Sequence, residues 1–192
     1  MARPSTARPA SAGRASGAGP RSTGATFHGE ARFGGATFRR WAGFYGATFH
    51  REAAFSRVVF HREAGFDEAT FNGETGFDGA TFNGEAGFVG ATFQGWAQFE
   101  RASFRDSAGF PWATFQDLAG FVGASFQEGA VFGGAAFHGD AKFDGATFQD
   151  GAVFDVVTFH GWARFDGVTF QDLAGFVGAT FEDGCGSSAG TG

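Results

Sequence analysis

Large apolar residues recur along this chain at a strict interval. All 29 phenylalanines lie in one series, from Phe27 to Phe181, and the steps between them alternate between six and five residues. Two residues before each Phe stands an Ala, except at Val58, Thr75, Val157 and Val168. Because a spacing of two places both side chains on the same face of an extended segment, the pattern predicts short strands with Ala and Phe inside.

The two steps together make a period of 11, which also equals three turns of an α-helix, so a helix has to be weighed. Residues 25–183 contain 26 glycines, and each costs about 1 kcal/mol in a helix interior, so a helix is disfavoured by about 26 kcal/mol. The glycines instead gather two residues after Phe, as at Gly35, Gly46, Gly79, Gly90 and Gly123. This position suits a turn with positive φ.

The predicted architecture is therefore a β-solenoid, in which strands of about three residues alternate with corners. Successive coils pair their backbones at about 4.8 Å. The Phe and Ala side chains form the core. The residues that we assign to it are Phe27, Phe33, Phe38, Phe44, Phe93, Phe99, Phe148 and Phe154, with Ala25, Ala31, Ala91 and Ala97.

The repeated unit Ala-x-Phe-x-x resembles the pentapeptide repeat family, as in residues 36–40 (ATFRR) and 146–150 (ATFQD). The resemblance covers residues 25 to about 183. It implies an all-β fold, a right-handed quadrilateral β-helix with four sides per coil, and it implies a protein without enzymatic activity.

The chain departs from that family because every second unit carries one extra residue. Four sides would then use two periods per coil, a spacing of 22, and give about seven coils. A flat, two-sided solenoid with one period per coil stays open. Identical residues after alternate Phe recur more often at spacing 22, as in His28/His50 and Gln94/Gln116. Stacked like side chains are favourable in paired strands, which favours the four-sided form.

Three segments differ in composition. Residues 1–24 hold Arg3, Arg8, Arg14 and Arg21 but no acid, and we interpret them as a disordered basic tail. Residues 25–183 form the solenoid, and residues 184–192 form a flexible end. The chain shows no apolar run of the kind a secretion signal or membrane span needs. We therefore expect no membrane partner. The single cysteine, Cys185, allows no internal disulfide, and for this reason we expect a cytoplasmic location.

Charge is distributed unevenly. The formal net charge is −6, with −2 in residues 25–104 and −8 in residues 105–192. An acidic solenoid disfavours direct binding to nucleic acid. The family resemblance adds an alternative function, because some acidic members imitate duplex DNA and bind DNA gyrase or topoisomerase. In this chain Asp144, Asp155 and Asp166 would carry that mimicry.

The tryptophans are the candidate contacts for a protein partner. Trp41, Trp96 and Trp162 occupy the position of the extra residue, which must bulge outward at a corner, and Trp112 follows Pro111 in a neighbouring turn. Exposed aromatic residues often anchor partners. The competing interpretation is that the indoles fold back and merely cover the solenoid.

The remaining chemistry is sparse. The five histidines all follow a Phe in the repeated register, so they predict neither a metal site nor a catalytic cluster. We therefore expect no enzyme, no cofactor and no metal, and a function as a rigid scaffold for an unidentified protein partner. The unpaired strands at the solenoid ends leave a further alternative, a homo-oligomer or filament built by end-to-end stacking.

Overall fold

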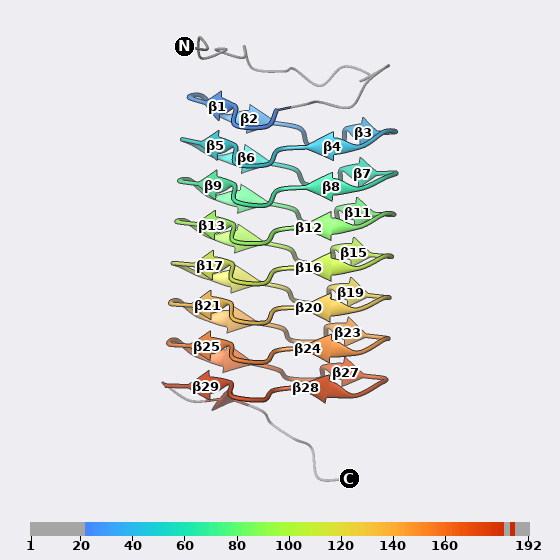
Figure 1. Ribbon diagram of the computed structural model, residues 1–192, viewed down its shortest axis with the longest axis vertical. Helices are drawn as coiled ribbons and strands as arrows, with labels where there is room; N and C mark the ends of the chain where they lie inside the picture. Colours follow the sequence, from blue (N-terminus) through green and yellow to red (C-terminus); the bar gives the residue numbers. More distant parts are fainter. Residues whose placement is uncertain (1–21, 183–184, 187–192) are drawn as a thin grey trace.

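The computed structural model describes residues 22–182 and 185–186, and it shows a stack of similar coils (Figure 1). Each coil carries four strands, and every strand in the described part of the chain has two residues. The strands are thus one residue shorter than the pattern predicts, because the corners take up the rest of each unit. Within the described ranges the chain forms no helix that could cross a membrane.

The strands of successive coils form four parallel sheets, which we number in chain order. The first sheet holds β1 (Thr26–Phe27), β5 (Thr48–Phe49), β9 (Thr70–Phe71), β13 (Thr92–Phe93), β17 (Thr114–Phe115), β21 (Ala136–Phe137), β25 (Thr158–Phe159) and β29 (Thr180–Phe181). The second holds β2 (Ala31–Arg32), β6 (Ala53–Ala54), β10 (Thr75–Gly76), β14 (Ala97–Gln98), β18 (Ala119–Gly120), β22 (Ala141–Lys142), β26 (Ala163–Arg164) and β30 (Cys185–Gly186).

The third and fourth sheets form the other half of each coil. The third holds β3 (Thr37–Phe38), β7 (Val59–Phe60), β11 (Thr81–Phe82), β15 (Ser103–Phe104), β19 (Ser125–Phe126), β23 (Thr147–Phe148) and β27 (Thr169–Phe170). The fourth holds β4 (Ala42–Gly43), β8 (Ala64–Gly65), β12 (Ala86–Gly87), β16 (Ala108–Gly109), β20 (Ala130–Val131), β24 (Ala152–Val153) and β28 (Ala174–Gly175).

The register settles the length of a coil. Thr26 pairs with Thr48 and Phe27 with Phe49, a spacing of 22 that holds in all four sheets. The chain from 25 to 178 therefore makes seven coils, the first from 25 to 46 and the seventh from 157 to 178. The prediction of a four-sided solenoid with two periods per coil is confirmed, and the two-sided form is wrong.

Backbone hydrogen bonds tie each coil to the next. In the first sheet the amide of Thr48 donates to the carbonyl of Ala25 at 2.8 Å. In the second sheet the direction reverses, since the amide of Ala31 donates to the carbonyl of Glu52 at 2.9 Å. A strand of two residues is too short to hold by itself, so its stability comes from this pairing and from the core.

Phenylalanine rings fill the interior in four columns. Rings of one column lie parallel, as in Phe88 and Phe110 with centroids 4.8 Å apart. Rings of facing columns meet edge to face, as in Phe88 and Phe99 at 5.5 Å and 90°. Both are favourable aromatic arrangements. The Ala that stands two residues before most Phe leaves room for the neighbouring ring, so the small and the large residue together make a dense core.

Burial of the core is complete in the middle of the stack and weaker at its last coil. Phe44, Phe93, Phe99, Phe148 and Phe154, together with Ala91 and Ala97, show no solvent exposure. In the first coil Phe33, Phe38 and Ala31 are also buried, whereas Phe27 and Ala25 are partly buried. At the other end Phe176 and Phe181 keep 36% and 37% of their surface exposed. A terminal ring lacks a neighbour on one side.

The corners explain the glycine spacing. The second residue after alternate Phe has positive φ in every coil, and glycines such as Gly35 (69°) and Gly46 (58°) fill most of these positions. The prediction from the glycine pattern is therefore confirmed. Five residues with side chains take the same conformation, namely Arg57, Glu68, Arg101, Trp112 and Val156. The neighbouring coils impose this turn, because a residue with a Cβ adopts it only at a cost.

The solenoid extends slightly past the predicted boundaries. The amide of Ser22 donates to the carbonyl of Gly43, and that of Gly24 to Tyr45, so these residues already contact the first coil. At the other end β30 pairs with β26. Residues 1–21, 183–184 and 187–192, which include most of both predicted tails, lie outside the described residues.

Candidate functional site

Two of the four tryptophans share an exposed column. Trp96 and Trp162 each precede a strand of the second sheet, at the corner that follows the first sheet. These two residues are 45% and 56% exposed, and Leu118 and Asp140 lie between them in the same column. Since they are three coils apart, about 14 Å separates their levels in the stack. We call Trp96, Leu118 and Trp162 the tryptophan column.

Trp41 lies elsewhere and covers the surface. Its indole occupies the space over Gly43, where an added Cβ would overlap the ring. The indole stacks on Tyr45 at 5.7 Å, and the Tyr45 ring lies in turn over Gly65. The Tyr45 hydroxyl donates to Glu63 Oε1 at 2.5 Å. Burial and this hydrogen bond raise the pKa of Tyr45 to about 12.

Trp112 lies at a third place, the corner between the fourth and first sheets. It has φ of 57°, and the face of its indole lies against Gly134 of the next coil. It nevertheless remains 67% exposed. The four tryptophans thus do not form one surface. The covering interpretation describes Trp41, whereas Trp96 and Trp162 stand out from the solenoid.

The three aspartates proposed for mimicry of DNA are also divided. Asp144 and Asp166 share the corner between the second and third sheets. The Nη2 atom of Arg164 lies 3.4 Å from Oδ2 of Asp144 and 3.3 Å from Oδ2 of Asp166. Asp155 lies at a different corner, where its carboxylate accepts the amide of Val177 at 2.9 Å. The placement of these three residues therefore forms no common acidic face, and it does not favour the DNA-mimic alternative.

Four of the five histidines stack in pairs, as spacing 22 predicts. The His28 and His50 rings are 5.1 Å apart, and the His138 and His160 rings are 4.6 Å apart. Neighbours extend these pairs, since Asn72 contacts His50 at 3.3 Å and Glu182 contacts His160 at 2.7 Å. Across residues 22–182, no three His, Cys, Asp or Glu side chains converge as metal ligands.

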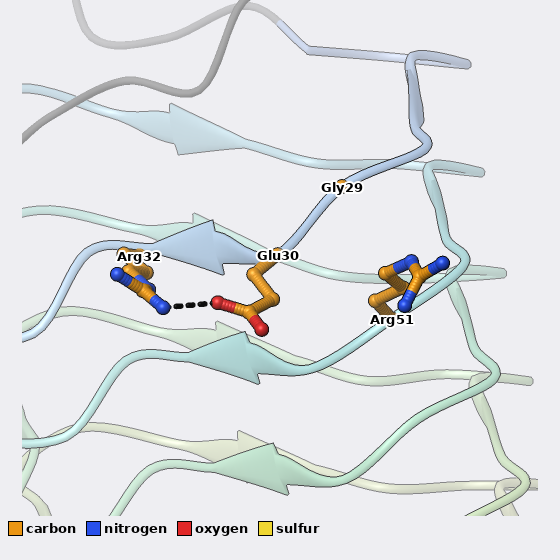
Figure 2. Close-up of a pocket in the computed structure, with 4 residues that line it drawn as sticks. All are labelled: Gly29, Glu30, Arg32 and Arg51. Atoms are coloured by element: carbon orange, nitrogen blue, oxygen red, sulfur yellow. Dashed lines mark hydrogen bonds and ion pairs between the residues drawn. The ribbon is translucent and has the colours of Figure 1, made fainter.

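A surface pocket lies at the corner of the first two coils (Figure 2). Gly29, Glu30, Arg32 and Arg51 line it. Arg32 pairs with Glu30, while Arg51 lies on the next coil. Two guanidinium groups and one carboxylate offer ionic contacts at the surface.

One acidic pair escaped the sequence analysis although spacing 22 could have found it. Glu100 lies one coil after Asp78 in the same column, and its carboxyl group lies over Gly120. Burial, followed by a hydrogen bond with Asp78 and its negative charge, raises the pKa of Glu100 to about 7, and Lys142 opposes this shift.

This pair predicts a pH dependence of stability. A raised carboxyl pKa means that the folded state holds its proton more tightly than the unfolded state does. The contribution is present at low pH and is lost as pH rises through about 7. Glu100→Gln keeps a neutral group, so we expect wild type to lose unfolding temperature relative to this variant between about pH 5 and pH 8. If the unfolding temperatures of the two proteins change with pH in the same way, the raised pKa of Glu100 is contradicted.

The fold and these surfaces define the class. A four-sided stack of parallel strands around Phe columns is a β-solenoid, a repeat architecture in which each coil contacts only its neighbours. The family model for pentapeptide repeats matches residues 23–59, 55–103 and 99–147, with nine copies. The chain belongs to the pentapeptide repeat family, whose fold is typically structural rather than catalytic. No curated protein matches the chain.

Proposed function

We propose that this protein is a non-enzymatic, cytoplasmic scaffold that binds a protein partner through the tryptophan column. The observation that carries the proposal is the exposure of Trp96 and Trp162, about half of each residue, on a rigid sheet corner. Large aromatic side chains supply much of the binding energy in protein interfaces and lose little conformational entropy on binding. The repeated backbone pairing fixes the spacing between them.

The proposal is tested with the full chain as bait in an extract of its host. We expect the double variant Trp96→Ala/Trp162→Ala to lose a protein that wild type captures. A matched control is Trp41→Ala, which removes an indole of the covering type from another corner. Circular dichroism verifies that all three proteins are folded. Capture of the same proteins by the double variant would refute the role of the tryptophan column.

A further inference from the structure

The fourth sheet presents a mainly apolar outer surface that the tryptophan column does not share. Its own outward residues are uncharged, although the carboxylates of Asp67 and Asp155 lie over two of its glycines. These outward residues are Gly43, Gly65, Gly87, Gly109, Val131, Val153 and Gly175. Several of the most exposed large apolar residues flank it. These are Leu173 at 91%, Val177 at 74%, Val156 at 59% and Val89 at 41%. Exposed apolar surface of this kind marks an interaction site.

The two ends of this surface differ in shape. In the first coil Trp41 and Tyr45 lie over the glycines and add bulk. In the seventh coil Leu173 and Val177 occupy the same two columns and project into solvent. Large aromatic rings at one end and exposed aliphatic groups at the other end are complementary if two surfaces meet in opposite directions.

Charge along one edge of the surface reverses in the same sense. The corner between the third and fourth sheets begins with Arg39 and Arg40 in the first coil, and Arg62 follows in the second. The last three coils carry one acid each at this corner, namely Glu128, Asp150 and Asp172.

The middle of this edge is mixed in charge. Glu63 of the second coil accepts a hydrogen bond from the Tyr45 hydroxyl. Glu85 lies in the third coil, and the fourth holds Arg105 beside Asp106. The edge therefore runs from positive in the first coil to negative in the seventh.

We propose that the fourth sheet binds a second copy of this chain, antiparallel to the first and related to it by a two-fold axis. The first coil of each copy then faces the seventh coil of the other. Arg40 meets Asp172 of the second copy, and Arg62 meets its Asp150. The aromatic pair Trp41 and Tyr45 packs on Leu173 and Val177 of the second copy.

The centre of the edge accepts this arrangement. Arg105 and Asp106 lie in the fourth coil, at the two-fold axis, so each arginine reaches the aspartate of the other copy. Glu85 of the third coil faces Glu128 in the fifth coil of the second copy. Both of these glutamates are exposed in the single chain, so in the dimer their carboxylates remain hydrated at the edge of the interface.

The opposite edge also accepts it. There Asp67 faces Asp155 of the second copy. Both carboxylates are turned toward their own solenoid, where each accepts a backbone amide of the next coil at 2.9 Å. Burial raises the pKa of Asp67, and the hydrogen bond from the amide of Val89 opposes this shift only in part.

The area is adequate for a stable pair. Seven coils span about 34 Å, and the sheet with its two corners is on the order of 20 Å wide. Two such strips bury on the order of 1,400 Å² together, which falls in the size class of specific interfaces. An interface on one flat side closes after two copies, because the surface meets its own equivalent.

A charge exchange distinguishes this pairing from others. Analytical ultracentrifugation should show wild type at twice the chain mass of 20.0 kDa. Arg40→Asp/Arg62→Asp places acid against acid at four contacts, and Asp150→Arg/Asp172→Arg places base against base. We expect each variant alone to dissociate at least about 100-fold more readily. An equimolar mixture of the two variants should form a dimer again, because every contact regains an opposite charge.

A second measurement tests the direction of packing without relying on charge. In a Cys185→Ser background, Trp41→Cys and Leu173→Cys together should form disulfides between copies on mild oxidation. The control pair Glu30→Cys and Leu173→Cys should not, because residue 30 lies at another corner. The proposal would be overturned if the protein is a monomer at all concentrations. It would also be overturned if the charge variants do not weaken the dimer, or if assemblies larger than a dimer form as the concentration rises. None of these results bears on partner capture by Trp96 and Trp162.

Discussion

Phe99→Asp should abolish the folded coil stack. Phe99 is fully buried in the middle coil. Its ring stacks on Phe77 at 5.0 Å and on Phe121 at 4.9 Å, and it meets Phe88 and Phe110 edge to face at 5.5 Å. Loss of a buried Phe costs about 3–5 kcal/mol, and an unpaired carboxylate in its place adds several more. That sum approaches the whole stability of an ordinary domain.

The measurement is far-ultraviolet circular dichroism with a thermal melt. Thr92→Ser serves as the control, because Thr92 faces outward at the same level and the change removes one methyl group. Phe99→Leu provides an intermediate step, with a loss of about 1–3 kcal/mol. Equal melting of Phe99→Asp and wild type would show that the ring does not occupy the interior.

Gly139→Ala is expected to destabilise the protein by about 2–3 kcal/mol. A Cβ at this position would come within 2.6 Å of the backbone carbon of Asp117, in the coil before it. Backbone at this point is held by pairing on both sides, so it cannot move away cheaply, and overpacking costs of this size are typical. The unfolding temperature should fall by roughly 5–10 °C.

The matched control is Gly129→Ala. A Cβ on Gly129 meets nothing within 4 Å, and φ at Gly129 is not in the left-handed region. We expect its stability to stay within about 0.5 kcal/mol of wild type, since the only remaining effect is on the unfolded chain. If both variants melt alike, the tight approach between coils at Gly139 is not real.

The interior of this protein was predictable because one period controls it. Ala-x-Phe sets the inward faces, and the recurrence of His28 at His50 already favoured a coil of two periods over a coil of one. The stacked His28 and His50 rings show the same spacing in the structure. Strand length was less predictable, because a pattern of period two does not reveal where pairing stops and a corner begins.

The surface was harder to predict, because it depends on residues one coil away. Trp41 and Trp96 occupy equivalent positions before an Ala, but Gly43 offers the first indole a place to lie, while Gln98 stands beside the second. The exposed side chains of Leu173 and Val177 likewise emerge only when columns are read along one sheet. Glu100 shows the same limit, since its raised pKa comes from burial and from Asp78 in the previous coil.

The presence of two sequence periods in every coil has one consequence for how such a chain can change in length. Opposite sides of a coil have nearly the same internal plan. Duplication of a single period would thus leave the packing intact and rotate everything downstream by half a turn. Surface groups beyond the insertion would then point to the opposite side of the rod. Duplication of a whole coil would keep these groups on their original side. Whether an odd or an even number of periods is inserted therefore determines which surface groups lie on the same side of the rod.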